Sequence, residues 1–464
     1  MAVTTKTGTT GLGMTRPGTA EPGIARSVVA GPVPARTAIG RPHVVVMGAG
    51  WAGCAAAVAA ALAGARVTLV ERTDMILGTG LVGGIMKNNG RLTAAEELRA
   101  MGARALLDAI EPCLLHRGVR FPGHEHASLY DVTRIESAVL EVLAAFEIDL
   151  HLMSTCTGLA RDGNRVVSAK LGTGEIIGGD AFIDATGTAG PRANCRSYRS
   201  GCVMCILRCP SFGPRISPLR SLGIDETPRV PTAATSGSVK VLKSSLSRDI
   251  VQLLEGNGVV EIPLPKSVSV AVAPSEKSCR QYTSDDFYKK LIVLHTGEAK
   301  VMVPYMPLRT LRSIPGLSRA RFLDPCSGGL GNSVRYNAIT PHDLTLRVTG
   351  FQNLFCAGEK VGLVVGHTEA ILTGTLAGHN AVRSALRIEL VEIPPTLMCG
   401  DFLSFVSSRL LSTEGLYDKY TFSGSVYLEH AVESGMYTTD SQVIGDRVRD
   451  SGLSGIFAAR LVDG

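Results

Sequence analysis

Residues 43–72 read HVVVMGAGWAGCAAAVAAALAGARVTLVER, and they give the strongest indication of the fold in this sequence. It opens with a short apolar run at 43–47 that is rich in valine, as is typical of a buried parallel strand. Residues 55–63 are rich in alanine and contain no proline, which predicts a helix that ends at Gly64. A second apolar run at 67–70 predicts another strand. The stretch therefore predicts a strand–helix–strand unit of a parallel sheet.

Gly48, Gly50 and Gly53 lie between the first strand and the helix in the spacing G-x-G-x-x-G. Gly48 allows the tight turn, Gly50 lets a pyrophosphate approach the backbone, and Gly53 lets the helix pack on the strand. The helix N-terminus offers free N–H groups and a partial positive charge to phosphates. Glu71 ends the second strand, 18 residues after Gly53, where it can accept hydrogen bonds from an adenosine ribose. This context favours a dinucleotide site over a glycine-rich turn that binds nothing.

Composition describes an ordinary globular protein that is long enough for two or more domains, with 464 residues of which 45% are hydrophobic and 19% charged. No apolar run approaches the roughly 20 residues needed to cross a bilayer, so we expect no membrane span. Residues 1–42 carry five basic residues and one acidic residue; subtracting this +4 from the chain's +6 leaves about +2. The body is therefore not strongly basic, and we expect no nucleic-acid partner.

The chain has 11 cysteines, an odd number, and most lie in apolar segments. This pattern does not fit a secreted disulfide framework and favours a reducing, cytoplasmic location. We expect Cys54, Cys156 and Cys356 to be small buried hydrophobic residues. Residues 1–41, rich in Thr, Gly, Pro and Ala, are predicted to be a disordered tail. A transit peptide is the alternative, although the glycines and prolines argue against its amphipathic helix.

Further along the chain, the pattern predicts helices at 93–110, with Thr93 as N-cap, and at 131–146. Strands are predicted at 149–152, 155–159 and 165–171, the last two joined by a turn at 161–164. Two more strands end in short polar turns. They are residues 181–183, followed by DATG at 184–187, and residues 354–357, followed by Gly358 and Glu359. A helix from about residue 368 contains Gly374 and Gly378 for close packing.

Three glycine-containing segments, in this order, resemble those of the flavoproteins of the glutathione-reductase type, which have two dinucleotide-binding domains. They are residues 43–72, the strand and DATG turn at 181–187, and the strand, turn and helix that begin at residue 354. The resemblance implies that residues 43–72 hold the ADP half of FAD and that DATG makes a second contact. NLFCAGE, residues 353–359, resembles the last FAD motif of the family, in which an acid hydrogen-bonds the ribityl chain. That acid is usually Asp and is Glu359 here. The irregular, glycine-rich residues 73–92 are expected to run past the cofactor.

The C-terminal motifs are similar to those of the GidA/TrmFO family, namely NSVRYN at 332–337, Pro341, NLFCAGE, GHTEA at 366–370 and LAGHNA at 376–381. These flavoproteins modify uridine in tRNA. GidA-type members use reduced flavin at the wobble uridine, and TrmFO-type members methylate a uracil with a folate donor. The chain departs from the family in two respects. Residues 73–92 lack the TrmFO cysteine, and only about 80 residues follow Asn380, too few for the GidA tRNA-binding region.

The fold class that we expect is α/β, a Rossmann-like FAD-binding domain (parallel sheet with helices, β-meander) with an inserted second α+β domain. The expected parts are a tail at 1–41, the FAD-binding domain at 42–190 and 341–390, an inserted substrate or redox domain at 191–340, and a C-terminal extension at 391–464. The residues expected to bind FAD are Gly48, Ala49, Gly50, Trp51, Ala52, Gly53, Glu71, Arg72, Ala185, Thr186, Gly187, Gly358, Glu359, Gly366 and Thr368.

Cys202, Cys205 and Cys209 form a C-x2-C-x3-C-P cluster that the family resemblance does not explain. One interpretation is an iron–sulfur cluster, although Arg199 stands where the first cysteine of a ferredoxin run would be. The fourth ligand would then be Cys195, Cys279 or Cys326. A second interpretation is a redox pair, Cys202 and Cys205, which exchanges electrons with the flavin. The third is a set of buried or zinc-holding thiols.

His367 lies at the predicted start of the helix after Gly366. In flavoproteins of this type that helix start lies close to the pyrimidine end of the flavin, where its dipole stabilises negative charge on the reduced ring. His367 is therefore a candidate acid/base group, or alternatively a cap or packing residue. Arg335 and Tyr336 are weaker candidates for the same cavity. His124 and His126, beside Pro122 and Gly123, are expected in a solvated loop.

The leading hypothesis is an FAD-dependent oxidoreductase that acts on a small molecule, with Cys202, Cys205 and His367 as catalytic residues and no metal site among them. Electrons would come from NAD(P)H or a protein donor, and a homodimer is left open. The alternatives are a uridine-modifying flavoenzyme of the TrmFO kind, a flavin and iron–sulfur electron-transfer protein, and a non-catalytic flavin-binding scaffold.

Overall fold

The structure is a computed structural model, and it describes residues 40–187, 209–213, 215–226, 233–235, 238–268, 284–303, 306–323, 334–336 and 338–462. The predicted tail, except its last two residues, lies outside these ranges, as do Cys202 and Cys205. Cys209 begins the short helix α6 (Cys209–Phe212), but its side chain is not described. The predictions for the cysteine cluster therefore stay predictions.

A five-stranded, all-parallel sheet forms the centre of the fold, in the order β17-β10-β1-β2-β6. The strands are β17 (Leu354–Cys356), β10 (Ala181–Asp184), β1 (His43–Met47), β2 (Arg66–Val70) and β6 (Asp149–His151). Every residue of β1, β10 and β17 is buried, as expected for strands covered on both faces. The sheet thus brings together the carboxyl ends of the strands in all three glycine-containing segments.

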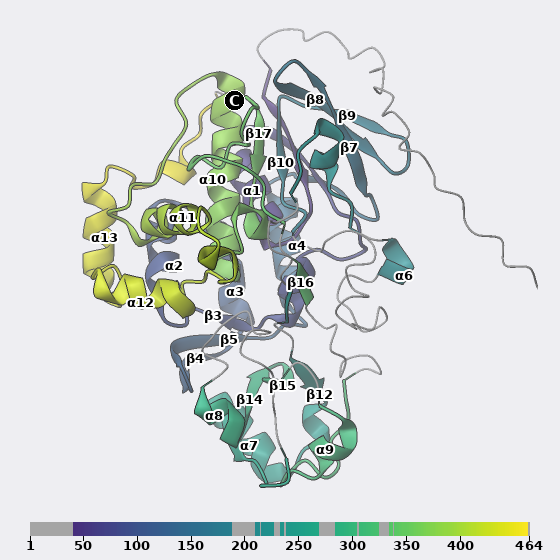
Figure 1. Ribbon diagram of the computed structural model, residues 1–464, viewed down its shortest axis with the longest axis vertical. Coiled ribbons are helices and arrows are strands. Elements are labelled where there is room, and N and C mark those ends of the chain that lie inside the picture. Colours follow the sequence, from purple (N-terminus) through teal and green to yellow (C-terminus); the bar gives the residue numbers. More distant parts are fainter. Residues whose placement is uncertain are drawn as a thin grey trace, which may run out of the picture. The chain divides into compact units, whose positions relative to one another are not determined.

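Helices α1 (Trp51–Leu62) and α10 (His367–Leu386) pack against one another beside this sheet (Figure 1). A Cβ atom added to Gly374 would lie 2.1 Å from the carbonyl oxygen of Ala52, and one added to Gly378 would lie 2.2 Å from that of Ala56. The prediction that these two glycines serve close packing is therefore confirmed. Helix α1 begins four residues before the predicted 55–63, because Trp51 to Cys54 form its first turn.

An antiparallel meander lies in the chain between β6 and β10 of the parallel sheet, as the strand and turn pattern predicted. It consists of β7 (Cys156–Asp162), β8 (Arg165–Leu171) and β9 (Ile176–Gly178). Cys54, Cys156 and Cys356 are buried and free, which confirms their predicted place in apolar surroundings.

The helix predicted at 93–110 is two helices, α2 (Gly90–Ala100) and α3 (Ala105–Ile110). The break falls at Gly102, whose φ is +97° and where a Cβ atom would lie 2.7 Å from the Ala458 nitrogen. Thr93 does not cap a helix. It lies inside α2 and donates a hydrogen bond from Oγ1 to the Thr438 carbonyl (2.6 Å). The predicted helix at 131–146 is α4 (Ile135–Ala145).

The expectation of a solvated loop around His124 and His126 is wrong. Strands β4 (Leu114–Phe121) and β5 (His124–Tyr130) form a hairpin that β3 (Ile85–Met86) extends. The proline and glycine at 122–123 make only the tight turn between these strands. The His124 side chain lies in the interior, hydrogen-bonded to Asn88 (2.9 Å) and beside the Phe121 ring (4.5 Å between centroids). His126 is only partly exposed.

Acid should destabilise the protein through His124. Burial, and then the charge of Arg91, lower the pKa of this imidazole from 6.5 to about 3. Between pH 3 and pH 6.5 this imidazole is protonated in the unfolded chain but not in the folded chain. Its contribution to the free energy of unfolding is therefore fully present above pH 6.5 and is lost as the pH falls towards 3. At pH 5 the loss is about 2 kcal/mol. Urea unfolding at pH 7 and pH 5 measures it, and His124→Leu should remove this part of the pH dependence. An unchanged dependence in the variant would contradict the assignment.

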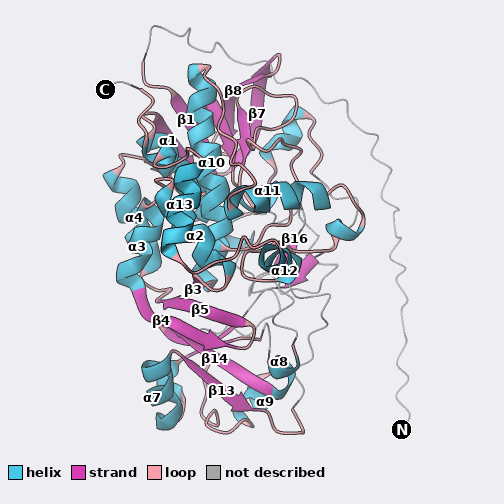
Figure 2. Cartoon of the chain, turned by 90° about the vertical axis from the view of Figure 1, so that its left-hand side faces the viewer, coloured by secondary structure: helices cyan, strands magenta, loops and turns pink. Residues whose placement is uncertain are grey.

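Residues 238–323 contain a second, antiparallel sheet in the order β12-β15-β14-β13. Its strands are β12 (Val239–Val241), β13 (Val259–Pro263), β14 (Lys290–Thr296) and β15 (Glu298–Val301). The same stretch contains the helices α7 (Arg248–Asn257), α8 (Asp285–Lys289) and α9 (Leu308–Arg312). One hydrophobic cluster lies wholly within this stretch, and another joins it to the β3–β5–β4 sheet. Figure 2 shows β4 and β5 beside β14. A two-stranded pair, β11 (Ala233–Thr235) and β16 (Val334–Tyr336), is the last of the strands found in the described ranges.

The C-terminal residues form α11 (Met398–Arg409), α12 (Ser425–Glu433) and α13 (Ser441–Asp450), and α11 and α13 contact α2. Glu97 of α2 is buried and accepts hydrogen bonds from the Met398 and Cys399 backbone nitrogens, at 2.8 Å each. Its carboxylate therefore caps the N-terminus of α11. None of the helices within the described ranges combines the length and the apolar character that a membrane crossing needs.

Candidate functional site

The three glycines after β1 have three different surroundings. Gly48 has φ of +95°, and a Cβ atom there would lie 2.6 Å from the Ala185 carbonyl oxygen. At Gly53 a Cβ atom would lie 1.7 Å from the Gly48 oxygen, whereas at Gly50 it would meet nothing within 4 Å. Gly48 therefore makes the turn, Gly53 lets the helix pack, and Gly50 borders open space. This is the arrangement that a diphosphate lying against the backbone requires.

Glu71 ties the end of β2 to the glycine turn. Its Oε2 accepts a hydrogen bond from the Ala49 nitrogen (2.9 Å), and its Oε1 accepts from the nitrogen (2.9 Å) and hydroxyl (3.1 Å) of Thr73. The next residue, Arg72, donates from Nη1 to the Gly213 carbonyl (2.6 Å). The carboxylate thus holds two backbone segments at the point where the sequence places an adenosine ribose.

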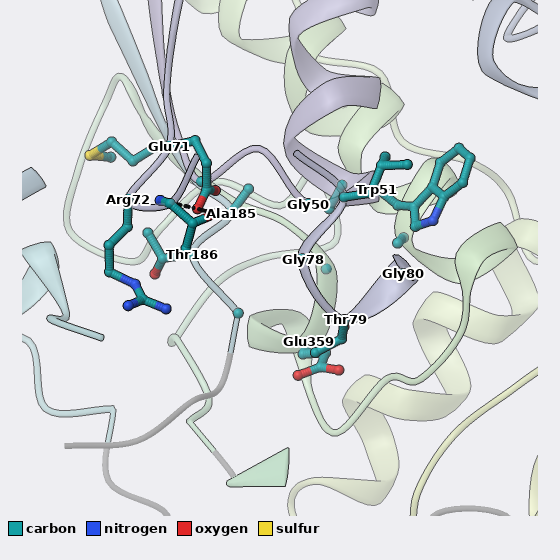
Figure 3. A pocket seen from close by; sticks show the side chains of 18 of the residues that line it. Gly50, Trp51, Glu71, Arg72, Gly78, Thr79, Gly80, Ala185, Thr186 and Glu359 are labelled. Carbon is teal, nitrogen blue, oxygen red and sulfur yellow. Dashed lines mark hydrogen bonds between the residues drawn. The ribbon is translucent and has the colours of Figure 1, made fainter. Parts of the chain in front are cut away.

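A groove runs along the carboxyl ends of β1, β2 and β10 and past the N-terminus of α10, and residues from all three glycine-containing segments line it. Figure 3 shows Glu71, Arg72 and Thr186 on one side of it and Trp51 on the other, with Gly50 and Gly78 between them. The predicted residues that line it are Gly48, Gly50, Trp51, Ala52, Glu71, Arg72, Ala185, Thr186, Gly187, Gly358, Glu359, Gly366 and His367. The predicted residues Ala49, Gly53 and Thr368 do not line it, because they lie behind its surface.

Several further parts of the groove lining are not among the residues predicted from the sequence. The first is part of residues 73–92, the glycine-rich segment expected to run past the cofactor, of which Thr73, Met75 and residues 77–81 line the groove. Residues 154–156 and the pair Arg215 and Ile216 also line the groove. Nothing in the local sequence marks these, because only the folded chain brings them to the sheet edge.

Asp184, Thr186 and Arg215 hold the turn after β10. The Oδ1 atom of the buried Asp184 accepts hydrogen bonds from the Thr186 nitrogen (3.0 Å) and hydroxyl (2.7 Å). Arg215 donates from Nε to the Thr186 carbonyl (3.0 Å) and from Nη2 to its hydroxyl (2.9 Å). Burial lowers the pKa of this guanidinium, while the charges of Asp184 and Glu226 oppose that shift. The groove therefore has a fixed cationic group beside Thr186.

A buried ionic cluster lies behind this turn. The ammonium of Lys360 contacts both Asp184 and Glu226, and its side chain has no exposed surface. Burial alone would raise the pKa of Glu226, but Lys360 and Arg215 hold it below its usual value. Glu226 Oε1 also accepts a hydrogen bond from the Thr340 hydroxyl (2.8 Å). The cluster joins the DATG turn to the segment after β17.

The start of α10 carries His367 into the groove. Its ring lies 5.5 Å from the Trp51 ring and 5.9 Å from the Tyr130 ring, measured between centroids. The Tyr130 hydroxyl is 3.5 Å from His367 Nδ1, and burial raises the pKa of that phenol. A Cβ atom at Gly83 would lie 2.1 Å from His367 Cε1. Tyr130 and Gly83, neither of which the sequence singled out, therefore define the position of the imidazole.

The start of α10 is also fixed from behind. Arg91 donates from Nε to Glu369 (3.0 Å) and from Nη2 to the Val365 carbonyl (3.1 Å). Glu369 Oε1 accepts in addition from the Phe422 nitrogen (2.8 Å) and the Thr421 hydroxyl (2.7 Å). These contacts are buried, so the N-terminus of α10 is rigidly placed relative to α2 and the C-terminal residues.

The residues of the groove fit a dinucleotide cofactor. Gly50 leaves room against the backbone, and the indole nitrogen of Trp51 is buried with no hydrogen-bond partner among the described residues. A buried donor of this kind usually has a partner, which a bound ligand can supply. Within the residues that the structure describes, no cluster of three or more His, Cys, Asp or Glu side chains could hold a metal ion.

Comparison with known proteins agrees with this fold and groove. The family model described as "FAD dependent oxidoreductase" matches residues 43–191, and the model described as "Glucose inhibited division protein A" (GidA) matches residues 291–389. The structure of Aquifex aeolicus GidA in its form II crystal superposes with a TM-score of 0.63, covering 89% of this chain and 74% of that one at 16% identity. At this identity the likeness concerns the fold.

Two curated relatives are the tRNA (uracil-5-)-methyltransferases TrmFO of Crocosphaera subtropica and Trichormus variabilis. They are 37% identical over 100 residues and 39% identical over 103 residues, in each case 22% of this chain. The matched stretches span about a fifth of the relatives' length, 21% and 22%.

In its fold and in the match at residues 43–191, the chain is similar to flavoproteins of the FAD-dependent oxidoreductase class. Within that class the chain is GidA/TrmFO-like. The predicted resemblance is thus confirmed. The expectation that nucleic acid is not a partner is weakened, because the relatives are named for tRNA. An iron–sulfur cluster gains no support from these comparisons.

Proposed function

We propose that the groove binds FAD and that the protein is an FAD-dependent oxidoreductase. The observation that carries the proposal is the set of three glycine environments after β1, with open space only at Gly50. The N-terminus of α1 would face the diphosphate, Glu71 the adenosine ribose and Glu359 the ribityl chain. When bound, the flavin would supply two-electron redox chemistry. His367 would exchange a proton with the substrate in the part of the groove that Trp51 also lines.

The test is to purify the protein, denature it and identify the small molecule released. We expect one FAD per chain and a flavin absorbance band that disappears on reduction. The release of no adenine-containing ligand by a folded preparation that also fails to bind added FAD would falsify the proposal. A folded state is checked by cooperative thermal unfolding.

Uridine in tRNA is the substrate class that a specific observation favours over an unidentified small molecule. The TrmFO relatives carry that substrate in their names, and the GidA family model matches residues 291–389. The test is binding of unmodified tRNA at increasing salt. Affinity should fall steeply as phosphate contacts are screened. Weak binding that is insensitive to salt would favour the small molecule.

Cys202 and Cys205 are proposed as a redox pair that exchanges electrons with the flavin. The proposal rests on their C-x-x-C spacing, since both lie outside the described residues. In Cys202→Ser, electrons should no longer pass between the flavin and the thiols, while FAD content should not change. Titrating the reduced protein with a thiol reagent before and after flavin reoxidation measures this.

A further inference from the structure

Two lysines of the second sheet reach the backbone of the segment that lines the groove. Lys240 of β12 and Lys300 of β15 are directly paired across neighbouring strands, so both side chains leave the sheet on the same face. Lys240 Nζ donates to the Leu81 carbonyl at 3.2 Å. Lys300 Nζ donates to the Val82 carbonyl at 2.6 Å and also to that of Gly83. Three consecutive carbonyls are thus held by two ammonium groups.

These carbonyls are suitable partners for cations. Residues Gly78–Val82 form a short 3₁₀ helix, and the carbonyls at its C-terminal end have no partners inside the helix. Lys300 is only 6% exposed, and burial, followed by the charge of Lys240, lowers its pKa from 10.5 to about 7. A buried lysine beside a second, partly buried lysine is costly unless its donors are bonded. Such a pairing is therefore hard to explain as incidental surface packing.

The segment whose carbonyls the two lysines bind, residues 78–83, contacts His367, the proposed acid/base group. Residues 78–81 line the groove, and Gly83 lies against the His367 ring, where an added Cβ would be 2.1 Å from Cε1 and 2.9 Å from the Tyr130 hydroxyl. The backbone at Gly83 is therefore the wall against which the imidazole rests. Neither lysine lines the groove. Their influence on the site passes through the carbonyls of residues 81–83.

We propose that Lys240 and Lys300 are positioning residues that clamp the carbonyls of residues 81–83 and so fix the His367 imidazole at the end of the groove. The clamp makes the second sheet part of the site without contributing a group that touches the ligand. Its consequence for catalysis rests on the proposed function, whereas the clamp itself does not require FAD.

Hydrogen–deuterium exchange of the protein without added cofactor tests the clamp. In Lys300→Met, and in the less buried Lys240→Met, the amides of residues 78–86 should exchange about tenfold faster than in the wild type. Lys300→Arg, which keeps charge and donors, should restore slow exchange. Lys290→Met is the control, because Lys290 lies on β14 of the same sheet and pairs with Glu261 (2.7 Å). Unchanged exchange in both lysine variants would overturn the proposal.

The second readout is the NMR signal of the His367 Cε1 proton, assigned by its loss in His367→Gln. Lys300→Met should shift this signal, and Gly83→Ala, which pushes directly on the ring, should shift it as well. Lys290→Met should leave it in place. Lower thermal stability of Lys300→Met without a shift of the His367 signal would mean a merely structural lysine and would refute the positioning role. A protein that shows the clamp but binds no FAD would refute the proposed function alone.

Discussion

Gly50→Val should lower the affinity for FAD by a factor on the order of 100, which corresponds to about 3 kcal/mol of binding free energy. Gly50 caps α1 with an extended backbone (φ −67°, ψ 179°), which valine can adopt, and a Cβ atom there meets nothing within 4 Å. The new side chain therefore occupies only the space that the proposal assigns to the diphosphate. Fluorescence titration of the apoprotein with FAD measures the affinity, and urea unfolding should give a stability within about 1 kcal/mol of the wild type.

Two variants control this experiment. Gly256→Val places the same side chain on α7, where the added Cβ also meets open space, and should change neither affinity nor stability appreciably. Gly53→Ala should instead fail to fold normally, since its Cβ would lie 1.7 Å from the Gly48 oxygen. Normal FAD affinity in Gly50→Val would show that the cofactor does not approach this turn.

Lys360→Met should lower the free energy of unfolding by about 3–5 kcal/mol, because it leaves Asp184 and Glu226 buried without their cation. The ammonium contacts both carboxylates, and neither Lys360 nor Asp184 has any exposed side-chain surface. Chemical denaturation measures the loss. FAD affinity should fall as well, because Asp184 orients the Thr186 turn at the groove.

A surface lysine provides the comparison for Lys360. Lys289 pairs with Asp285 at 3.1 Å, but the two side chains are 70% and 88% exposed, so Lys289→Met should cost less than about 1 kcal/mol. Adding Glu226→Gln to Lys360→Met should recover part of the stability, since it removes one of the two buried carboxylate charges that lost Lys360. Equal losses for Lys360→Met and Lys289→Met would contradict the account of the buried cluster.

The sequence alone predicted those parts of the fold and of the groove that short local motifs encode. The strand–glycine–helix pattern at residues 43–72 predicted β1, α1 and β2, and the turns after residues 183 and 357 predicted where the groove would be completed. Each of these motifs encodes its own backbone geometry within a few residues, so no knowledge of distant contacts was needed.

Prediction failed where tertiary contacts decided the outcome. Pro122 and Gly123 looked like a loop, yet Asn88 and Phe121 take His124 into the interior. Thr93 looked like a cap, but its hydroxyl bonds to residue 438, more than 300 residues away. Arg215, Tyr130 and Lys300 belong to the groove or its support only because the folded chain brings their segments together. Motifs and periodicity within a short stretch of sequence do not reveal contacts between residues that lie far apart in the chain.

The close contact of α1 with α10 determines when the groove can be completed during biosynthesis. Its walls come from residues near 50, near 155, near 186, near 215 and finally near 367. A ribosome that has released only the first half of the chain has therefore produced the glycine turn without its opposing helix, and Ala52 and Ala56 still lack their glycine partners. Binding of the proposed FAD must therefore be a late event. Until Gly378 has emerged, the face of α1 that carries Ala52 and Ala56 stays uncovered in the nascent chain.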